Sequence, residues 1–323
     1  MKRRILLCAV TALLFSLQVN AASVNGKIKA LIVDGQNNHI VWPKSTVMMK
    51  QYLEESGSFN VEVYRYKPLW RVQQHTDYLS IHNSDTQFVV DKPEYDETFS
   101  PDFSKYDVVI SNIGYNATDW PISTQKSFEQ YLQNGGGFVS VHAANNSFPD
   151  WDEYNRIVGV SGWGGRNEKH GPHLFYDESG REVRDFSKGD AGQHGNKHEF
   201  AITLRHSHPI TKGLPPVWMH TKDECYGNLR GPAQNITVLA TALCPKEEKG
   251  TGLHEPMLMV LNYGQGRIFH TTLGHDDYSF ESVGFITTFL RGTEWAATGK
   301  VTIPVPADFP SKTTSSARAF IFK

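Results

Sequence analysis

A cluster of three glycines leads into a short β-forming run that ends at a histidine, and this segment constrains the fold most. Residues 135–146 read Gly-Gly-Gly-Phe-Val-Ser-Val-His-Ala-Ala-Asn-Asn. The glycines end a helix, and the chain then turns into a strand. This order is typical of an open α/β sheet, in which ligands bind beyond the carboxyl ends of the strands. His142 is therefore expected at a ligand-facing edge, where enzymes with a nucleophile elbow carry Ser or Cys.

Strands and helices alternate along the first half of the chain. Strands are expected at 28–33, 59–64 and 106–112, with a fourth that ends at residue 142, and helices at 45–57 and 123–134, the second capped by Ser123. This order predicts an α/β fold with a mostly parallel sheet and helices on both faces. Residues 66–104 are polar and are expected to form a long surface insertion.

The second half has a different pattern. Residues 160–197 are Gly-rich and irregular, and strands are expected at 198–205 and 236–243. Residues 256–263 and 267–273 flank Gly264-Gln-Gly266 and predict a β-hairpin. A final helix is expected from about 280 to 297, and the Pro- and Ser-rich segment 304–323 is expected to be a mobile tail.

The amino terminus has the three parts of a secretory signal peptide. Lys2, Arg3 and Arg4 precede an apolar run that ends near Val19, and small residues surround Ala21. The run is shorter than the roughly 20 residues that a membrane-spanning helix needs. We therefore expect residues 1–21 to be removed, residues 22–303 to form one domain, and the mature protein to be periplasmic or secreted without stable membrane insertion.

Charge and cysteine content limit the function classes. The chain has 32 Lys and Arg against 34 Asp and Glu, so no nucleic-acid partner is expected. No GxSxG, P-loop or GxGxxG motif follows a strand, which argues against serine hydrolases and nucleotide-binding proteins. Cys225 and Cys244 remain after cleavage and can form a disulfide in an oxidising compartment, but the sequence does not show whether they pair.

Histidines and carboxylates recur where strands end. His275 and Asp276 follow a strand as His142 does, His39 lies in the first βα loop, and Glu224 stands in a polar segment. Imidazoles and carboxylates transfer protons and bind divalent metals. The alternative is a purely structural role, with hydrogen-bonded histidines and a solvated acidic turn. The candidate catalytic residues are His142, Glu224, His275 and Asp276, and the candidate ligands of a possible divalent metal ion are His39, His142, Glu224 and His275.

Further polar residues are candidates for holding a substrate. The Gly-rich loop around residues 164–173 can line either a sugar site or a metal site, and arginines there can donate hydrogen bonds to a polyol or a carboxylate. The candidate substrate-binding residues are His39, Arg166, Asp223, Tyr226 and Arg230.

Taken together, the motifs resemble the trehalose-utilisation (ThuA-like) family, whose fold is that of the class I glutamine amidotransferases. The resemblance extends over about residues 29–299. It rests on the motifs at 34–39, 135–144, 164–172, 208–215, 218–224 and 264–276. It implies a flavodoxin-like domain with an elaborated C-terminal half. Glutamine amidotransferases carry their nucleophilic Cys where this chain has His142, so the resemblance argues against glutamine hydrolysis.

The resemblance also implies a role in sugar catabolism, beside oxidoreductases that make 3-keto sugars. We therefore expect an exported enzyme that isomerises or cleaves a sugar or 3-keto-glycoside, with Glu224 or His142 as base and His275 as acid or metal ligand. The main alternative is a non-catalytic carbohydrate-binding protein with the same fold. A third possibility is an amidohydrolase that uses water instead of a Cys nucleophile. The oligomeric state and the presence of a metal stay open.

Overall fold

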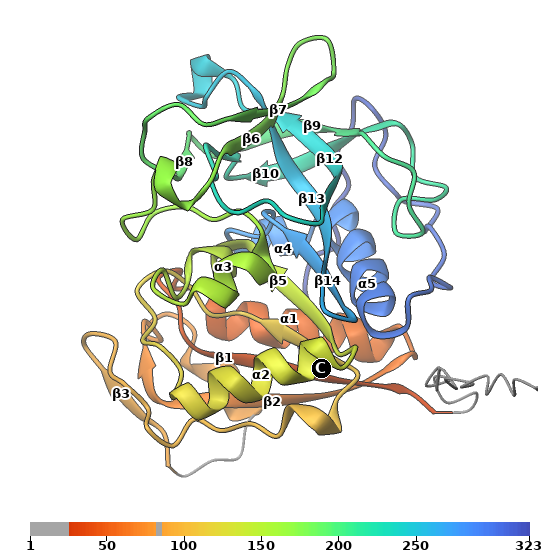
Figure 1. The fold of residues 1–323 in the computed structure, drawn as a ribbon. Helices are drawn as coiled ribbons and strands as arrows, with labels where there is room; N and C mark the ends of the chain where they lie inside the picture. The colour runs from red at the N-terminus through yellow and green to blue at the C-terminus, as the bar shows by residue number, and fades with distance from the viewer. Residues whose placement is uncertain (1–25, 82–85) are drawn as a thin grey trace, which may run out of the picture.

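The first five strands of the chain, together with β14, form the parallel part of a twelve-stranded sheet. The structure is a computed structural model that describes residues 26–81 and 86–323. The strand order in this part is β14-β5-β4-β1-β2-β3 (Figure 1). The strands are β1 (Ile28–Gln36), β2 (Phe59–Trp70), β3 (Phe88–Val90), β4 (Val108–Ser111), β5 (Gly137–Val141) and β14 (Gly266–Thr271).

Antiparallel strands extend the sheet beyond β14. The order continues as β13, β12, β9 and β10, and β6 and β7 are attached to β13. A separate two-stranded sheet pairs β8 with β11. These strands are β6 (His173–Tyr176), β7 (Glu182–Asp185), β8 (Gln193–His194), β9 (His198–Leu204), β10 (Val217–Asp223), β11 (Tyr226–Gly227), β12 (Ile236–Leu243) and β13 (His254–Tyr263).

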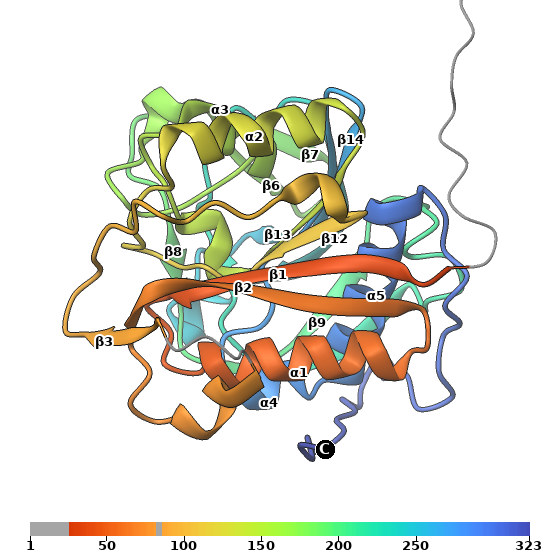
Figure 2. The same cartoon turned by 90° about the horizontal axis from the view of Figure 1, so that it is seen from below.

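Helices cover both faces of the parallel part. On one face, α1 (Trp42–Glu55) and α5 (Val283–Thr298) share a core with Ala30 and Ile32 of β1. On the other, α2 (Ile122–Gln133) and α3 (Asp152–Val158) share a core with Leu31 and Val33. Successive side chains of a strand point to opposite faces, so one apolar strand serves both cores. Figure 2 shows α1 and α2 on opposite sides of β1.

The predicted fold class is confirmed: the chain is an α/β protein whose parallel sheet has helices on both faces and whose C-terminal half is elaborated. The predicted cap of α2 is wrong, because Pro121 is the N-cap residue and no side chain caps the helix. The expected insertion at 66–104 includes the end of β2 and all of β3, and it buries Phe99 and Phe103 in the core around α2. The predicted final helix is α5, which begins at Val283 instead of at about residue 280, and a separate short helix, α4 (Asp277–Phe280), precedes it.

The two ends of the chain differ in what the structure describes. The predicted signal peptide, residues 1–21, lies outside the described residues. Within the described part of the chain, no helix is both long and apolar enough to span a membrane. The segment 304–323 packs Phe309 and Phe320 against the core, and the backbone N–H of Arg318 donates to the carbonyl of Glu281 over 2.9 Å. The mobility of this segment stays a prediction.

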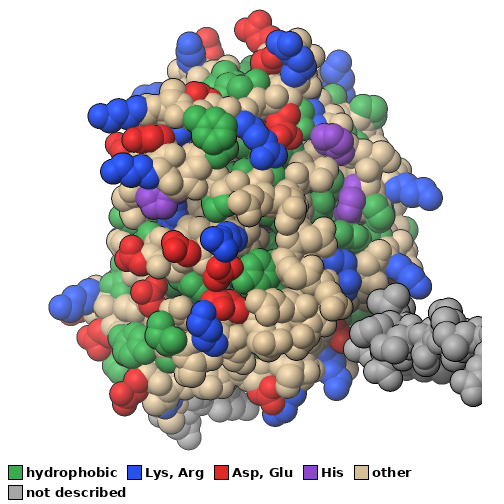
Figure 3. Space-filling model, viewed as in Figure 1, with side chains coloured by type: hydrophobic (Ala, Val, Ile, Leu, Met, Phe, Trp, Pro, Cys, Tyr) green, Lys and Arg blue, Asp and Glu red, His purple; other side chains and the backbone are tan. Residues whose placement is uncertain are grey.

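The surface carries charges of both signs. Figure 3 shows Lys and Arg side chains interspersed with Asp and Glu over the face in view. This mixture agrees with the small net charge of −2 and gives no extended basic stripe on that face.

Candidate functional site

Four strand ends bring imidazoles and a carboxylate together. His39 follows β1, His142 follows β5, and His275 follows β14. These three strands belong to the parallel part of the sheet, so their carboxyl ends meet at one edge. Glu224 comes from the antiparallel part and follows the last residue of β10. Each side chain is held by a short loop at the end of a strand.

His142 occupies a strained position at the end of β5. Its φ angle is +47°, in the left-handed region that non-glycine residues rarely adopt. Its Nδ1 lies 2.6 Å from the carbonyl oxygen of Thr272. A carbonyl only accepts, so Nδ1 carries the proton and Nε2 keeps its lone pair. Burial lowers the pKa of His142 to about 3, which keeps the ring neutral.

Glu224 lies at the centre of the cluster. Its side chain is 6% exposed. Its Oε1 lies 3.0 Å from Nε2 of His275 and 3.6 Å from Nδ1 of His194. Its Oε2 lies 3.8 Å from Nε2 of His142. The two carboxylate oxygens therefore face different imidazoles.

His275 lies between two carboxylates. Its Nε2 faces Glu224, and its Nδ1 lies 3.0 Å from Oδ2 of Asp276. Although burial alone lowers it, hydrogen bonds to Asp276 and Glu224 raise the pKa of His275 to about 9. Asp276 also accepts a hydrogen bond from Lys197 Nζ at 2.9 Å and one from the hydroxyl of Tyr278 at 2.9 Å. His275 therefore lies between two carboxylates that favour its protonated form.

His39 completes the cluster. Its ring centre lies 4.9 Å from that of His142 and 4.6 Å from that of His275. Its Nδ1 lies 3.2 Å from Oδ1 of Asn37. Burial, and then the neighbouring imidazoles, hold the pKa of His39 well below its usual value. One ligand atom from each of His39, His142 and Glu224 lies within 4.8 Å of the others, a spacing that suits a metal ion.

Asp223 fixes the two loops that carry Glu224 and His275. The residue is fully buried, and its Oδ1 accepts from the backbone N–H groups of Glu224 (2.9 Å) and His275 (3.0 Å). Its Oδ2 accepts from the N–H of Gly274 at 2.8 Å and lies 2.9 Å from Nε2 of His220. These contacts position the cluster, and the predicted contact between Asp223 and a substrate stays a prediction.

A disulfide joins Cys225 to Cys244. Its first cysteine stands between Glu224 and Tyr226 in the chain, so the covalent link to Cys244, the residue that follows β12, restrains both. The sequence left this pairing open, because the distance between the two cysteines depends on how β10 and β12 pack.

Aromatic rings border the cluster. The Tyr226 ring centre lies 4.2 Å from that of His142 and 5.0 Å from that of Trp163. Trp163 in turn lies 6.0 Å from His194, whose side chain is 46% exposed. Tyr226 itself is buried, and burial holds the pKa of its hydroxyl well above the usual value. Trp163 and His194 therefore lie on the solvent side of the cluster.

Sequence reasoning did not select Trp163 or His194 as site residues. The signal for Trp163 is its position in the run Gly162-Trp-Gly-Gly165, where glycines allow a bulky ring to lie against the turn. His194 stands in a two-residue strand that pairs with Tyr226, and this pairing is visible only in the structure.

Arg166 and Arg230 have contacts of their own. Arg166 is 1% exposed, and four of the five N–H groups of its guanidinium donate to Asn155, Asn146, Gly162 and Ser147. Arg230 is 3% exposed and donates to the carbonyl of Asp185. Both side chains stabilise loops, and their predicted contacts with substrate hydroxyls stay predictions.

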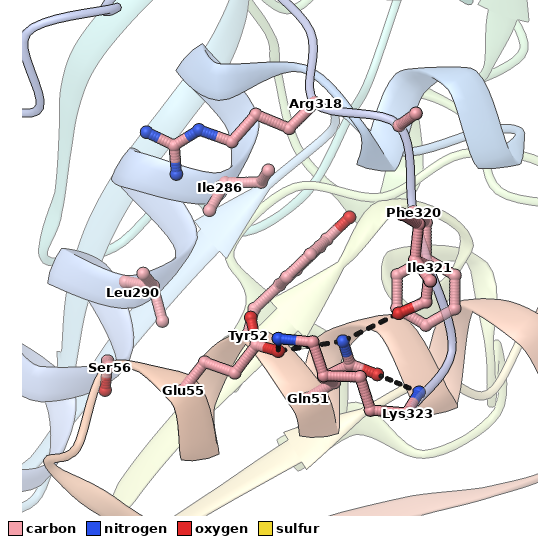
Figure 4. Close-up of a pocket in the computed structure, with 11 residues that line it drawn as sticks. Gln51, Tyr52, Glu55, Ser56, Ile286, Leu290, Arg318, Phe320, Ile321 and Lys323 are labelled. Carbon is pink, nitrogen blue, oxygen red and sulfur yellow. Dashed lines mark hydrogen bonds and ion pairs between the residues drawn. The ribbon is translucent and has the colours of Figure 1, made fainter.

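Two cavities differ in what they can hold. A small one, of about 10 Å³, touches His39 and His142 and has room for about one water molecule. A larger one, of about 410 Å³, lies between α1, α5 and the C-terminal segment. Figure 4 shows its lining: Tyr52, Ile286 and Leu290 are apolar neighbours, and Lys323 pairs with Glu55 at 2.8 Å. None of the clustered histidines lines the larger cavity.

Comparisons with known proteins agree with this architecture. A ThuA-like protein from Parabacteroides merdae has 42% sequence identity and a TM-score of 0.79, covering 91% of this chain and 98% of its own. A second, from Bacteroides uniformis, has 17% identity and a TM-score of 0.52 over 88% of this chain and 96% of its own, which shows a shared fold. No curated protein matches the chain.

The sequence profile named ThuA and described as trehalose utilisation matches residues 29–296, a span that contains all four clustered strand ends. This match supports a carbohydrate-related role. The chain belongs to the trehalose-utilisation (ThuA) family.

Proposed function

We propose that this protein is an exported enzyme of carbohydrate catabolism that isomerises or cleaves a sugar or 3-keto-glycoside by acid–base chemistry. The observation that carries the proposal is the position of Glu224 between two imidazoles, 3.0 Å from His275 and 3.8 Å from His142. Imidazole and carboxylate groups at such distances are suited to moving a proton within a small site. Family membership supports the substrate class.

The reaction needs a base beside a carbon–hydrogen bond and an acid beside an oxygen. A keto group acidifies the neighbouring C–H bond, and Glu224 or His142 takes that proton. The electron pair then moves onto the carbonyl oxygen to form an enediolate, which His275 stabilises by donating a hydrogen bond or a proton.

The fate of the enediolate decides the product. In an isomerisation, the former carbonyl oxygen takes a proton from the acid, the neighbouring hydroxyl gives up its proton, and a proton is returned to the former carbonyl carbon. The keto group has then moved to the adjacent carbon. When the glycosidic oxygen lies β to the carbanion, the electron pair instead expels that oxygen, which takes a proton from the acid, and the bond is cleaved by elimination. Both routes start with the same proton transfer and use the same residues.

The disulfide supports export. Disulfides form and persist in oxidising compartments and are rare in the cytosol. The link between Cys225 and Cys244 is therefore in keeping with the signal-peptide pattern of residues 1–21. Fractionation of producing cells into cytoplasm, periplasm and medium tests the location, and protein retained in the cytoplasm with residues 1–21 uncleaved contradicts it.

The activity test uses 3-keto-trehalose and related keto-glycosides in deuterated water. We expect the purified protein to exchange the hydrogen next to the keto group, followed by NMR, and to convert the sugar. Glu224→Gln keeps the size of the side chain and should abolish exchange, whereas Glu247→Gln, at an exposed glutamate, should leave it unchanged. Keto-glycosides left unchanged, with and without added divalent metals, would refute the proposal, and binding without turnover would indicate the carbohydrate-binding alternative.

A further inference from the structure

We propose that His39, His142 and Glu224 form a binding site for a single divalent transition-metal ion. The proposal concerns the same cluster as the proposed function and rests on it for the role of the ion, although the binding itself is measured without any sugar. One ligand atom from each of the three residues lies within 4.8 Å of the other two. Two ligands bound to one ion at about 2.1 Å cannot be more than about 4.2 Å apart, so small side-chain movements suffice to close the site.

The strongest observation is a buried nitrogen without a partner. Nε2 of His142 has no hydrogen-bond partner among the described residues, although the side chain is only 3% exposed. Buried polar atoms are nearly always satisfied, and an exception needs an explanation. A metal ion supplies one, because Nε2 faces Oε2 of Glu224 at a distance too long for a hydrogen bond but suited to two ligands of one ion.

The orientation of both histidines fits metal ligation. A metal-binding imidazole usually donates its other ring N–H to a carbonyl or carboxylate, which fixes the tautomer and directs the free lone pair to the ion. His142 makes this contact with Thr272, at 2.6 Å, and His39 makes it with Asn37, at 3.2 Å. Oδ1 of Asn37 also accepts the backbone N–H of His39 at 2.9 Å, which identifies that atom as oxygen. Each Nδ1 is thereby occupied, and each Nε2 keeps its lone pair.

Glu224 is oriented in the same way. His275 lies 3.0 Å from Oε1, which leaves Oε2 as the oxygen on the side of His142. The other ring nitrogen of His275, Nδ1, lies 3.0 Å from Oδ2 of Asp276. The carboxylate is thus positioned to give one oxygen to the ion and the other to His275.

The ligand set selects the class of metal. Two imidazoles and one carboxylate suit Zn²⁺, Mn²⁺, Fe²⁺ or Co²⁺, whereas Mg²⁺ and Ca²⁺ prefer oxygen ligands alone. Three protein ligands leave coordination positions open, as in catalytic rather than structural sites. An ion held there would act as a Lewis acid on a substrate carbonyl. Because the ion takes the lone pair of His142 Nε2, Glu224 would then be the base of the proposed reaction.

The test measures metal content and affinity in untagged, full-length mature protein. Metal analysis of the purified protein, and calorimetric titration of chelator-treated protein with Zn²⁺, Mn²⁺ and Co²⁺, should show about one tightly bound ion per chain. Replacing a residue that orients a metal ligand weakens metal binding roughly 10–100-fold. His275→Ala, which removes the neighbour of Glu224, should weaken binding by such a factor. The ligand changes His39→Ala and Glu224→Gln should weaken it more. His194→Ala is the control, since His194 neighbours Glu224 but lies outside the proposed ligand set.

The outcomes separate this proposal from the proposed function. Thermal unfolding of each variant in the presence of chelator shows whether it folds, and Glu224→Gln preserves shape if His39→Ala does not fold. No stoichiometric binding of the three ions, or binding that both ligand variants retain, overturns the metal site. Turnover of keto-glycosides by protein that binds none of the three ions overturns the metal site and leaves the proposed function standing. Metal binding without turnover of keto-glycosides supports the metal site and overturns the proposed function.

Discussion

Replacing Asp223 with alanine should destabilise the folded protein more than removing any exposed carboxylate does, although Asp223 is not one of the proposed metal ligands. The fully buried carboxylate accepts the backbone N–H groups of Glu224, Gly274 and His275 and contacts His220. Asp223→Ala leaves these donors without their acceptor. The loops that carry Glu224 and His275 then lose the group that joins them.

The magnitude follows from the number of donors. A buried donor left unsatisfied costs about 1–3 kcal/mol, and Asp223→Ala leaves the backbone N–H groups of Glu224, Gly274 and His275 without their acceptor. His275 is partly exposed and can recover a water molecule, so we expect a loss of about 4 kcal/mol rather than the full sum. For a chain of this size each kcal/mol lowers Tm by about 2 °C, which gives a decrease of about 8 °C.

The assay is urea unfolding followed by tryptophan fluorescence, with thermal unfolding as a second measurement. Asp223→Asn retains an oxygen for the N–H groups of Glu224 and His275 but places an amide opposite Gly274, so it should lose about half as much. Asp308→Ala removes a carboxylate from an exposed pair with Arg318 and should change stability by less than about 1 kcal/mol. If Asp223→Ala costs no more than Asp308→Ala, the reasoning is refuted.

Three further changes test other parts of the structure. Replacing Cys225 and Cys244 with alanine opens a loop of sequence separation 19 and should cost about 3 kcal/mol, and an unchanged Tm under non-reducing conditions would contradict this. Gly274→Ala should destabilise the protein by more than about 1 kcal/mol, because φ is +111° and the new Cβ would lie 3.1 Å from Phe280. Equilibrium unfolding measures this loss, and a substitution without effect would argue against the backbone conformation at Gly274. Trp163→Ala should weaken sugar binding by about 1 kcal/mol, roughly fivefold in Kd, by calorimetry with a keto-glycoside. Phe186→Ala, at a side chain exposed by 69%, should leave that Kd unchanged.

Local patterns in the sequence predicted the parallel half of the fold well. The apolar run 30–33 is buried on both faces, and the glycines at 135–137 follow the end of α2, so both signals are contained in short segments. The rule that parallel strands share one carboxyl edge then placed His39, His142 and His275 together. Their convergence follows from topology and needs no knowledge of side-chain packing.

The antiparallel part of the fold and the contacts around the cluster depend on residues that are distant in sequence. β10 reads Val-Trp-Met-His-Thr-Lys-Asp, with little alternation, and its place is set by antiparallel pairing to β9, whose register shifts between His220 and Asp223. The burial of Arg166 depends on acceptors from residues 146, 147, 155 and 162, and no local pattern shows this. The role of Asp223 is likewise invisible until the loop at 274–275 folds against it.

The cluster requires both parts of the sheet. The three histidines come from the parallel strands, whereas Glu224 comes from the antiparallel extension, and Asp223 joins the two through the N–H groups of Gly274 and His275. The left-handed φ of His142 costs about 1–3 kcal/mol, a strain that persists only where the surroundings impose it. A glycine at this position would relieve that strain. It would also remove the Nδ1 that contacts the carbonyl of Thr272 and the Nε2 that faces Glu224. The strained imidazole at the end of β5 and the carboxylate brought to it by the extension therefore argue for a joint chemical role rather than for two independent structural ones.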